Sequence, residues 1–150
     1  MFFTRKDIVF KEIPNHISLC FSIAGCQKEC KGCHSKELWY ENPKTQTKLD
    51  TKLLKKYLKK YIFFIDSVCF LGGDWHKQKL ISFLKIIKEN DLITCLYTAE
   101  NYIENDLIPY LNYIKIGKYI ESKGGLENLN TNQKFNNLKT NENLNYLFQK

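Results

Sequence analysis

The sequence lacks any run of apolar residues long enough to cross a membrane. Its first fourteen residues, MFFTRKDIVFKEIP, alternate charged with apolar side chains. They have neither the continuous apolar core nor the small-residue cleavage site of a signal peptide. The chain also lacks an internal repeat and a clear boundary between domains. We therefore expect one cytoplasmic domain over residues 1–150, with no membrane partner.

Acidic residues are in the minority, since 16 Asp and Glu face 23 Lys and Arg and the formal net charge is +7. Such an excess raises the question of nucleic-acid binding. Many of the lysines, however, alternate with apolar residues in stretches such as KLLKKYLKKYI, which is typical of the solvated face of an amphipathic helix. We expect no nucleic-acid partner, and the surplus charge favours docking on an acidic partner surface.

Short apolar runs alternate with segments of helical spacing. Strands are predicted at residues 16–23, 67–71, 92–98 and 113–116, and helices at 52–62, 77–90 and 101–111. Strands that alternate with helices indicate an α/β fold with a parallel sheet and right-handed crossovers. Residues 126–150 are rich in asparagine and poor in pattern, so a partly ordered tail is expected there.

The six cysteines fall into two groups. Three stand apart inside apolar stretches and are expected to be small buried residues: Cys20, Cys69 and Cys95. The other three lie together in GCQKECKGCH, at Cys26, Cys30 and Cys33. In a reducing compartment, clustered cysteines more often bind metal or perform redox chemistry than form disulfides.

Three clustered thiols are an unusual ligand set. Structural zinc takes four protein ligands, and His34 would be the fourth. His34 directly follows Cys33, however, and adjacent side chains rarely coordinate the same ion. A four-iron cluster usually takes four cysteines, so three would leave one iron open to a substrate or cofactor. An open coordination position is a catalytic feature.

Further candidate residues follow the other predicted strands. Gly72, Gly73 and Asp74 come after the second strand, Thr98 closes the third, and Gly117 follows the fourth. Loops at the carboxyl ends of parallel strands emerge at the same edge, where ligands bind in such folds. We therefore expect the cysteine loop and these residues to form one site.

The cysteine spacing, with GGD after the second strand, resembles the radical S-adenosylmethionine (SAM) enzymes. In more detail, the chain is similar to the activating proteins of the anaerobic (class III) ribonucleoside-triphosphate reductases. GCQKECKGCH, Leu38-Trp39, FLGGDW, LYT, IKIGKY and TNQKF occur in the order found in that family, over residues 16–135. The resemblance implies a partial, open (β/α) barrel, which suits a chain too short to close an eight-unit barrel.

The resemblance also implies an oxidoreductase mechanism. Three irons of a 4Fe–4S cluster would be held by Cys26, Cys30 and Cys33, and the fourth iron by the amino and carboxylate groups of SAM. The amino group would be received by the loop Gly72, Gly73 and Asp74, and the ribose would face Thr98. The adenine side would be lined by the backbone around Gly32, Cys33 and His34.

The implied reaction splits SAM into methionine and a 5′-deoxyadenosyl radical, which takes a hydrogen atom from a glycine. The implied partners are the large subunit of the anaerobic ribonucleotide reductase, which is the glycyl-radical protein, and an electron donor such as flavodoxin or ferredoxin. The cofactor supplies the difficult chemistry, and the protein positions it.

The chain departs from the family pattern at four places. Trp75 stands where the wider superfamily often has proline, Ala99 replaces a frequent glycine, Ile116 replaces a frequent acidic residue, and KEIPN lacks the expected glycines. Two alternatives therefore stay open. One is an activase of another glycyl-radical enzyme or a peptide-modifying radical SAM protein, and the other is a non-enzymatic metal-binding or electron-carrier module.

Overall fold

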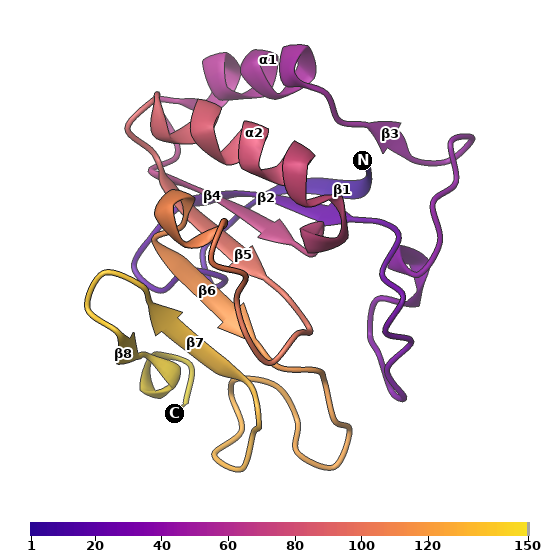
Figure 1. The fold of residues 1–150 in the computed structure, drawn as a ribbon, viewed down its shortest axis with the longest axis vertical. Helices are drawn as coiled ribbons and strands as arrows, with labels where there is room; N and C mark the ends of the chain where they lie inside the picture. The colour runs from indigo at the N-terminus through magenta and orange to yellow at the C-terminus, as the bar shows by residue number, and fades with distance from the viewer. Residues whose placement is uncertain (150) are drawn as a thin grey trace.

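The computed structural model describes residues 1–149, and these form one mixed eight-stranded sheet (Figure 1). The strands run in the order β3-β1-β2-β4-β5-β6-β7-β8. Their bounds are β1 Phe2–Val9, β2 Ser18–Ile23, β3 Thr47–Lys48, β4 Ser67–Leu71, β5 Ile93–Tyr97, β6 Tyr113–Ile116, β7 Lys134–Asn137 and β8 Glu142–Asn143. The four central strands, β2, β4, β5 and β6, pair in parallel, whereas the strands on both sides of them pair antiparallel.

Two α-helices, α1 Thr51–Tyr61 and α2 Lys77–Lys88, lie side by side over one face of the sheet (Figure 1). The Asp50 side chain caps α1 by accepting a hydrogen bond from the Leu53 N–H at 2.8 Å. The helices bury their apolar stripes against the same core as the sheet residues Phe21, Phe70 and Leu96. The helical residues buried there are Leu54, Leu58, Leu80, Phe83, Leu84 and Ile87.

A second, smaller core covers the opposite face of the sheet. Cys20, Cys69 and Cys95 lie in register on three neighbouring strands and are almost fully buried, as predicted. They share this core with Phe135 of β7 and with Leu126. Burial strongly raises the pKa of the Cys69 thiol, so these side chains act as neutral, apolar packing groups.

The prediction of a partial, open (β/α) barrel with a parallel sheet is wrong. A barrel needs a helix after each strand, but the described residues contain only two α-helices. The predicted helix at 101–111 is also wrong, because the only helical turn there is the 3-10 turn η3, Ile108–Tyr110. After β6 the chain returns antiparallel through β7, and β1 adds an antiparallel strand on the other side. These pairings make the sheet mixed.

Residues 126–149, expected to be a partly ordered tail, contain β7, β8 and the 3-10 turn η4 Asn145–Leu147. Phe135 has no exposed surface, and its ring stacks on that of Tyr113 with the centroids 5.7 Å apart. This segment therefore belongs to the hydrophobic core. Among residues 1–149, no helix has the length and apolar character of a membrane span.

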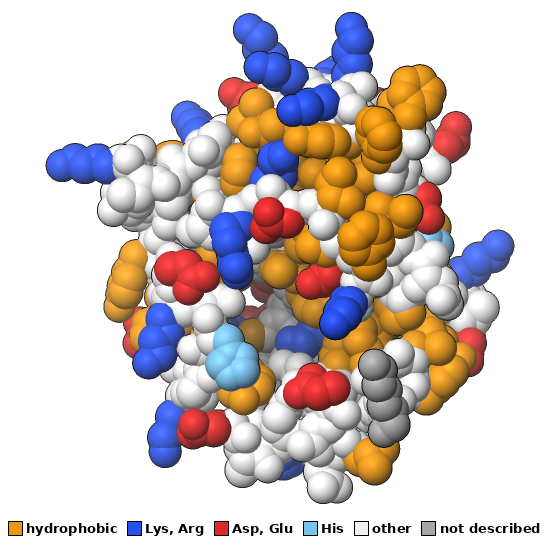
Figure 2. Space-filling view, turned by 180° about the vertical axis from the view of Figure 1, so that it is seen from behind, with side chains coloured by type: hydrophobic (Ala, Val, Ile, Leu, Met, Phe, Trp, Pro, Cys, Tyr) orange, Lys and Arg blue, Asp and Glu red, His pale blue; other side chains and the backbone are white. Residues whose placement is uncertain are grey.

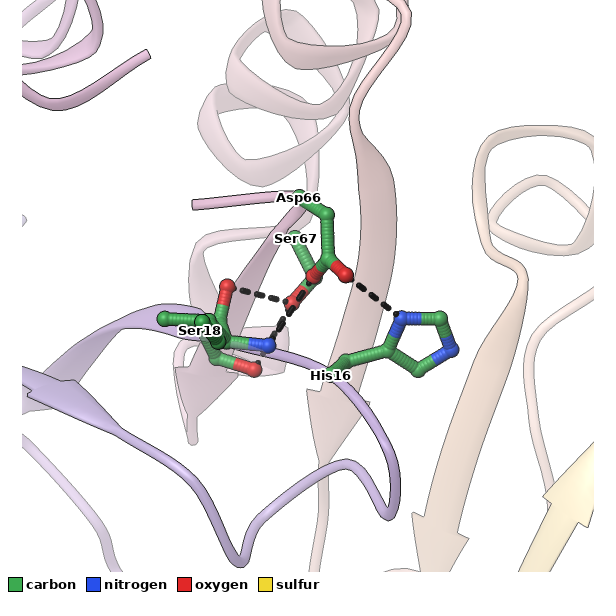
Figure 3. A network of polar contacts seen from close by, with 5 residues as sticks. His16, Ser18, Asp66 and Ser67 are labelled. Carbon is green, nitrogen blue, oxygen red and sulfur yellow. Dashed lines mark hydrogen bonds and ion pairs between the residues drawn. The ribbon is translucent and has the colours of Figure 1, made fainter. Parts of the chain in front are cut away.

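A polar network fixes the amino ends of β2 and β4 to each other (Figure 3). Asp66 accepts a hydrogen bond from the Ile17 N–H at 3.0 Å, and its other carboxylate oxygen lies 3.1 Å from Nδ1 of His16. The buried hydroxyls of Ser18 and Ser67 lie 2.8 Å apart. This network lies at the amino ends of the parallel strands, whereas the cysteine loop follows the carboxyl end of β2. The network therefore fixes the register of β2 against β4, and His16 has a structural role.

Candidate functional site

The three clustered cysteines lie on one closed loop that follows the carboxyl end of β2. The loop is closed at its base because the N–H groups of Gly25 and Cys26 both donate to the carbonyl of Leu38, at 2.8 and 3.0 Å. Inside the loop, the Cys33 N–H donates to the Cys30 carbonyl at 3.0 Å. The sequence therefore places three thiols on a short backbone segment with fixed ends.

The loop Gly72-Gly73-Asp74 follows the neighbouring strand, β4. Gly72 and Gly73 both have left-handed backbone conformations, with φ of 84° and 103°, which glycine adopts without a steric penalty. A Cβ on Gly72 would lie 2.5 Å from the ring of Trp75, so the indole packs directly on this backbone. The 3-10 turn η2, Asp74–His76, then leads into α2.

Asp74 is held by Thr98 at the end of β5. The Thr98 hydroxyl donates to Oδ2 of Asp74 at 3.0 Å and accepts a hydrogen bond from the Glu100 N–H at 3.0 Å. The other oxygen, Oδ1 of Asp74, is buried and has no hydrogen-bond partner among residues 1–149. Burial raises the pKa of the Asp74 carboxyl, although the Thr98 hydrogen bond partly opposes this. The carboxylate is therefore short of one donor.

A cavity of about 530 Å³ opens between these loops. Four of the predicted site residues line it: Cys26, Gly72, Asp74 and Thr98. Its apolar wall comes from side chains such as Ile103, Leu107 and Ile114. The space-filling view shows a hollowed face of the molecule, with basic and acidic side chains around and within the hollow (Figure 2).

The other predicted site residues lie outside this cavity lining. Cys30 is buried within the cysteine loop, and Cys33 Sγ accepts a hydrogen bond from the Ser35 N–H at 3.4 Å. Gly32 faces the carboxylate of Glu121, which lies 2.9 Å from the position of a Cβ at Gly32. His34 packs beside Tyr119, with their rings 5.5 Å apart. Gly73 packs on Ile23.

Two contacts that sequence reasoning missed hold the cysteine loop beside the cavity. The indole N–H of Trp75 donates to the Ala24 carbonyl at 3.2 Å, which joins the glycine loop to the cysteine loop. Lys28, between the first two clustered cysteines, pairs with Glu100 at 2.5 Å. The tryptophan directly after GGD was visible in the sequence as a departure, but the partner of Lys28 lies 72 positions away and had no sequence signal.

The positions of the three clustered thiols limit the kind of metal group that they could hold. No group of three His, Cys, Asp or Glu side chains within residues 1–149 is placed to hold a single metal ion. A four-iron cluster takes one thiolate per iron, so its ligands need not converge on one point. Burial raises the pKa of Cys26, and the charges of Cys30 and Cys33 raise it further. This donor set fits a cluster better than a single ion.

A comparison with protein families gives the class of the chain. Residues 17–144 match the family model described as a 4Fe–4S single cluster domain. Because this match covers most of the chain, the protein belongs to the 4Fe–4S single cluster domain family and is an iron–sulfur protein. No curated protein and no solved structure gave a match.

Proposed function

We propose that this protein is an activating enzyme that cleaves SAM reductively and generates a glycyl radical on the large subunit of the anaerobic ribonucleoside-triphosphate reductase. The proposal relies on the site rather than on a barrel fold. The observation that carries it is that Cys26 and Asp74 line the same cavity, and that Oδ1 of Asp74 has no hydrogen-bond partner among residues 1–149. A purely electron-carrying domain has no need for a ligand cavity beside its cluster.

The proposed cluster ligands are Cys26, Cys30 and Cys33. Cluster binding deprotonates all three thiols, and their mutual repulsion is then offset by the iron charge. Burial and neighbouring thiol charge hold the pKa of Cys26 above its ordinary value in the chain described here. Metal binding at this loop therefore releases protons, and loading is favoured by higher pH.

The glycine loop has the proposed role of receiving the amino group of SAM. Gly72 and Gly73 have left-handed backbones and carry no side chains of their own, although the Trp75 ring covers Gly72. Thr98 orients Asp74 through Oδ2 and leaves Oδ1 to accept an amino N–H. This pairing would satisfy the buried acceptor that has no partner within the described chain.

A reduced cluster held by Cys26, Cys30 and Cys33 would supply the one electron needed to cleave SAM to methionine and a 5′-deoxyadenosyl group that could take a hydrogen atom from the substrate glycine. Each activation thus consumes one electron, for which we propose flavodoxin or ferredoxin as the donor. The chain itself binds and orients SAM. The cavity lining includes exposed residues such as Tyr102, which supports the proposal that a loop from a large partner can enter.

The test is product analysis after anaerobic reconstitution of the cluster. Reduced protein and SAM should yield methionine and 5′-deoxyadenosine, and addition of the reductase should produce a glycyl-radical EPR signal on that partner. Cys33→Ala should remove both outcomes, whereas the matched control Cys95→Ala should retain them. SAM cleavage without a radical on the reductase would indicate another glycyl-radical or peptide substrate. Absence of SAM cleavage by a fully loaded, reduced protein would overturn the proposal and favour an electron carrier.

A further inference from the structure

A second pocket, of about 420 Å³, lies beside the cavity and shares Gln27 and Trp75 with it. Its wall is rich in aromatic rings and carboxylates, which belong to Trp39, Tyr40, Trp75, Glu29 and Glu41. Among the described residues, no Lys, Arg or Asp lines it, so the two glutamates give the wall a formal charge of −2 when His76 is neutral. The whole chain has a formal charge of +7, so this pocket is an acidic, aromatic hollow in a basic protein.

The two carboxylates of the pocket keep unused acceptor capacity. Oε1 of Glu41 lies 2.8 Å from Nε2 of His76, and Oε1 of Glu29 accepts a hydrogen bond from the Tyr40 hydroxyl at 3.2 Å. Within residues 1–149, the second oxygen of each glutamate has no hydrogen-bond partner. An ionised carboxylate only accepts hydrogen bonds, so a ligand that pairs with these oxygens has to be a donor.

The aromatic rings stand next to these carboxylates. Trp75 and Glu41 meet over the backbone of Gly25, where a Cβ would lie 3.0 Å from the indole nitrogen and 3.5 Å from Cγ of Glu41. The Trp39 ring already has a cation near it, because the ammonium of Lys36 lies 5.9 Å from the ring centre, although Lys36 is not part of the pocket wall. Faces of aromatic rings attract cations, and tryptophan does so most strongly.

We propose that this pocket binds an organic cation, namely a guanidinium or alkylammonium group. The rings cover the apolar surface of such a group, and Glu29 and Glu41 supply the opposite charge. A bare metal ion fits less well, because no three His, Cys, Asp or Glu side chains of residues 1–149 are placed to hold one. None of the clustered cysteines lines the pocket, so the inference does not depend on SAM cleavage.

Tryptophan fluorescence tests this assignment, because the only two tryptophans of the chain both line the pocket. The reconstituted protein is titrated anaerobically, at constant ionic strength, with two pairs of probes that differ only in charge. N-acetylarginine amide and the neutral N-acetylcitrulline amide represent a side chain of a protein partner. Choline and the neutral 3,3-dimethyl-1-butanol represent a free alkylammonium compound. In at least one pair, the cation should bind about five-fold or more tightly than its neutral isostere.

Two variants locate the binding. Trp39→Leu removes a ring that does not line the neighbouring cavity and leaves Trp75 as the reporter, and it should weaken cation binding about five-fold or more. Glu41→Gln keeps the size of the side chain and its contact with His76 but removes one charge, so it should reduce the preference for the cation. Glu142→Gln is the control, since it makes the same change at another exposed glutamate, on β8 and outside the pocket, and should have no effect.

A preference confined to the arginine derivative would support the inference and identify a protein side chain as the ligand, and one confined to choline would support it with a free ammonium compound. Equal binding of cation and isostere in both pairs would overturn it, as would failure of both cations to bind. An unchanged preference in Glu41→Gln, or an equal loss in Glu142→Gln, would also overturn it. These results are independent of the SAM cleavage assay, so failure here leaves the proposed function standing.

Discussion

Replacement of Phe135 by alanine tests whether the C-terminal segment is part of the core. The Phe135 side chain has no exposed surface and contacts three other aromatic rings, with centroid distances of 5.7 Å to Tyr113, 6.0 Å to Tyr97 and 5.0 Å to Phe148. Truncation of a buried phenylalanine to alanine typically costs about 3 to 5 kcal/mol, from lost burial and the cavity left behind. Domains of this kind have a free energy of unfolding of about 5 to 15 kcal/mol, so the expected loss is a large share of the total stability.

Urea unfolding followed by circular dichroism measures this loss, and thermal unfolding gives a second value. For a chain of this size, the expected free-energy change corresponds to a midpoint lower by about 6 to 20 °C. Leu129→Ala is the matched control, since Leu129 lies in the same segment with 81% of its surface exposed. That control should stay within about 0.5 kcal/mol of wild type.

Two results would refute this reasoning. If Phe135→Ala changed stability by less than about 1 kcal/mol, the packing of β7 on β6 would not contribute as its burial requires. If Leu129→Ala were as damaging as Phe135→Ala, the effect would reflect the segment as a whole rather than the buried ring. Phe135→Leu preserves most of the apolar volume, so it should lose less stability than the alanine variant and should remain folded.

Three further predictions concern the site. Alanine substitution of a proposed ligand, Cys26, Cys30 or Cys33, should lower the iron and sulfide content measured after reconstitution. Substitution of a second-core cysteine, Cys20, Cys69 or Cys95, should leave that content unchanged. Full cluster content in a variant of the first group would remove that residue from the ligand set. Gly72→Ala should destabilise the chain by about 1 to 2 kcal/mol in urea unfolding, because a left-handed backbone disfavours a Cβ and this one would lie 2.5 Å from the Trp75 ring; a neutral result would contradict that contact. The Asp74 pKa is raised in the folded chain, so the folded state keeps this proton to a higher pH and the wild type loses stability as pH rises above the ordinary aspartate pKa of about 3.9. Asp74→Asn lacks this loss, so its stability relative to wild type should increase between pH 4 and pH 7, and a relative decrease would contradict the burial of the charge.

The central strands and both α-helices were predictable because their patterns are local. The run SVCFL is apolar throughout and ends at two glycines, which is typical of a strand buried on both faces, and β4 has those same bounds. Leu54 and Leu58 are four residues apart, which places both on one face of α1. Such signals need no knowledge of the rest of the chain.

The antiparallel strands and the mixed topology were not predictable in this way. In β1, charged residues such as Arg5 and Asp7 interrupt the apolar pattern, and the strand forms through its pairing with β2. In β7, Phe135 is the one fully buried residue among polar neighbours, so its burial depends on the sheet that β6 provides. The barrel prediction assumed a helix after β5, where the structure has only one 3-10 turn.

The candidate site was predictable where it follows strand ends. The structure brings Cys26, Gly72, Asp74 and Thr98 around one cavity, although they span more than 70 positions of the chain. Lys115 was not predicted as a site residue, because an edge lysine and a buried one have the same sequence signature. The burial of Lys115 and its hydrogen bond to the Gly117 carbonyl are properties of the tertiary structure.

The central claim is that the cysteine loop holds a four-iron cluster with one iron open to SAM. EPR of the anaerobically reconstituted, reduced protein, recorded with and without SAM, tests it most directly. The account predicts a reduced 4Fe–4S signal that changes when SAM is added. A cluster signal indifferent to SAM, or a protein that binds stoichiometric zinc in place of iron, would contradict it.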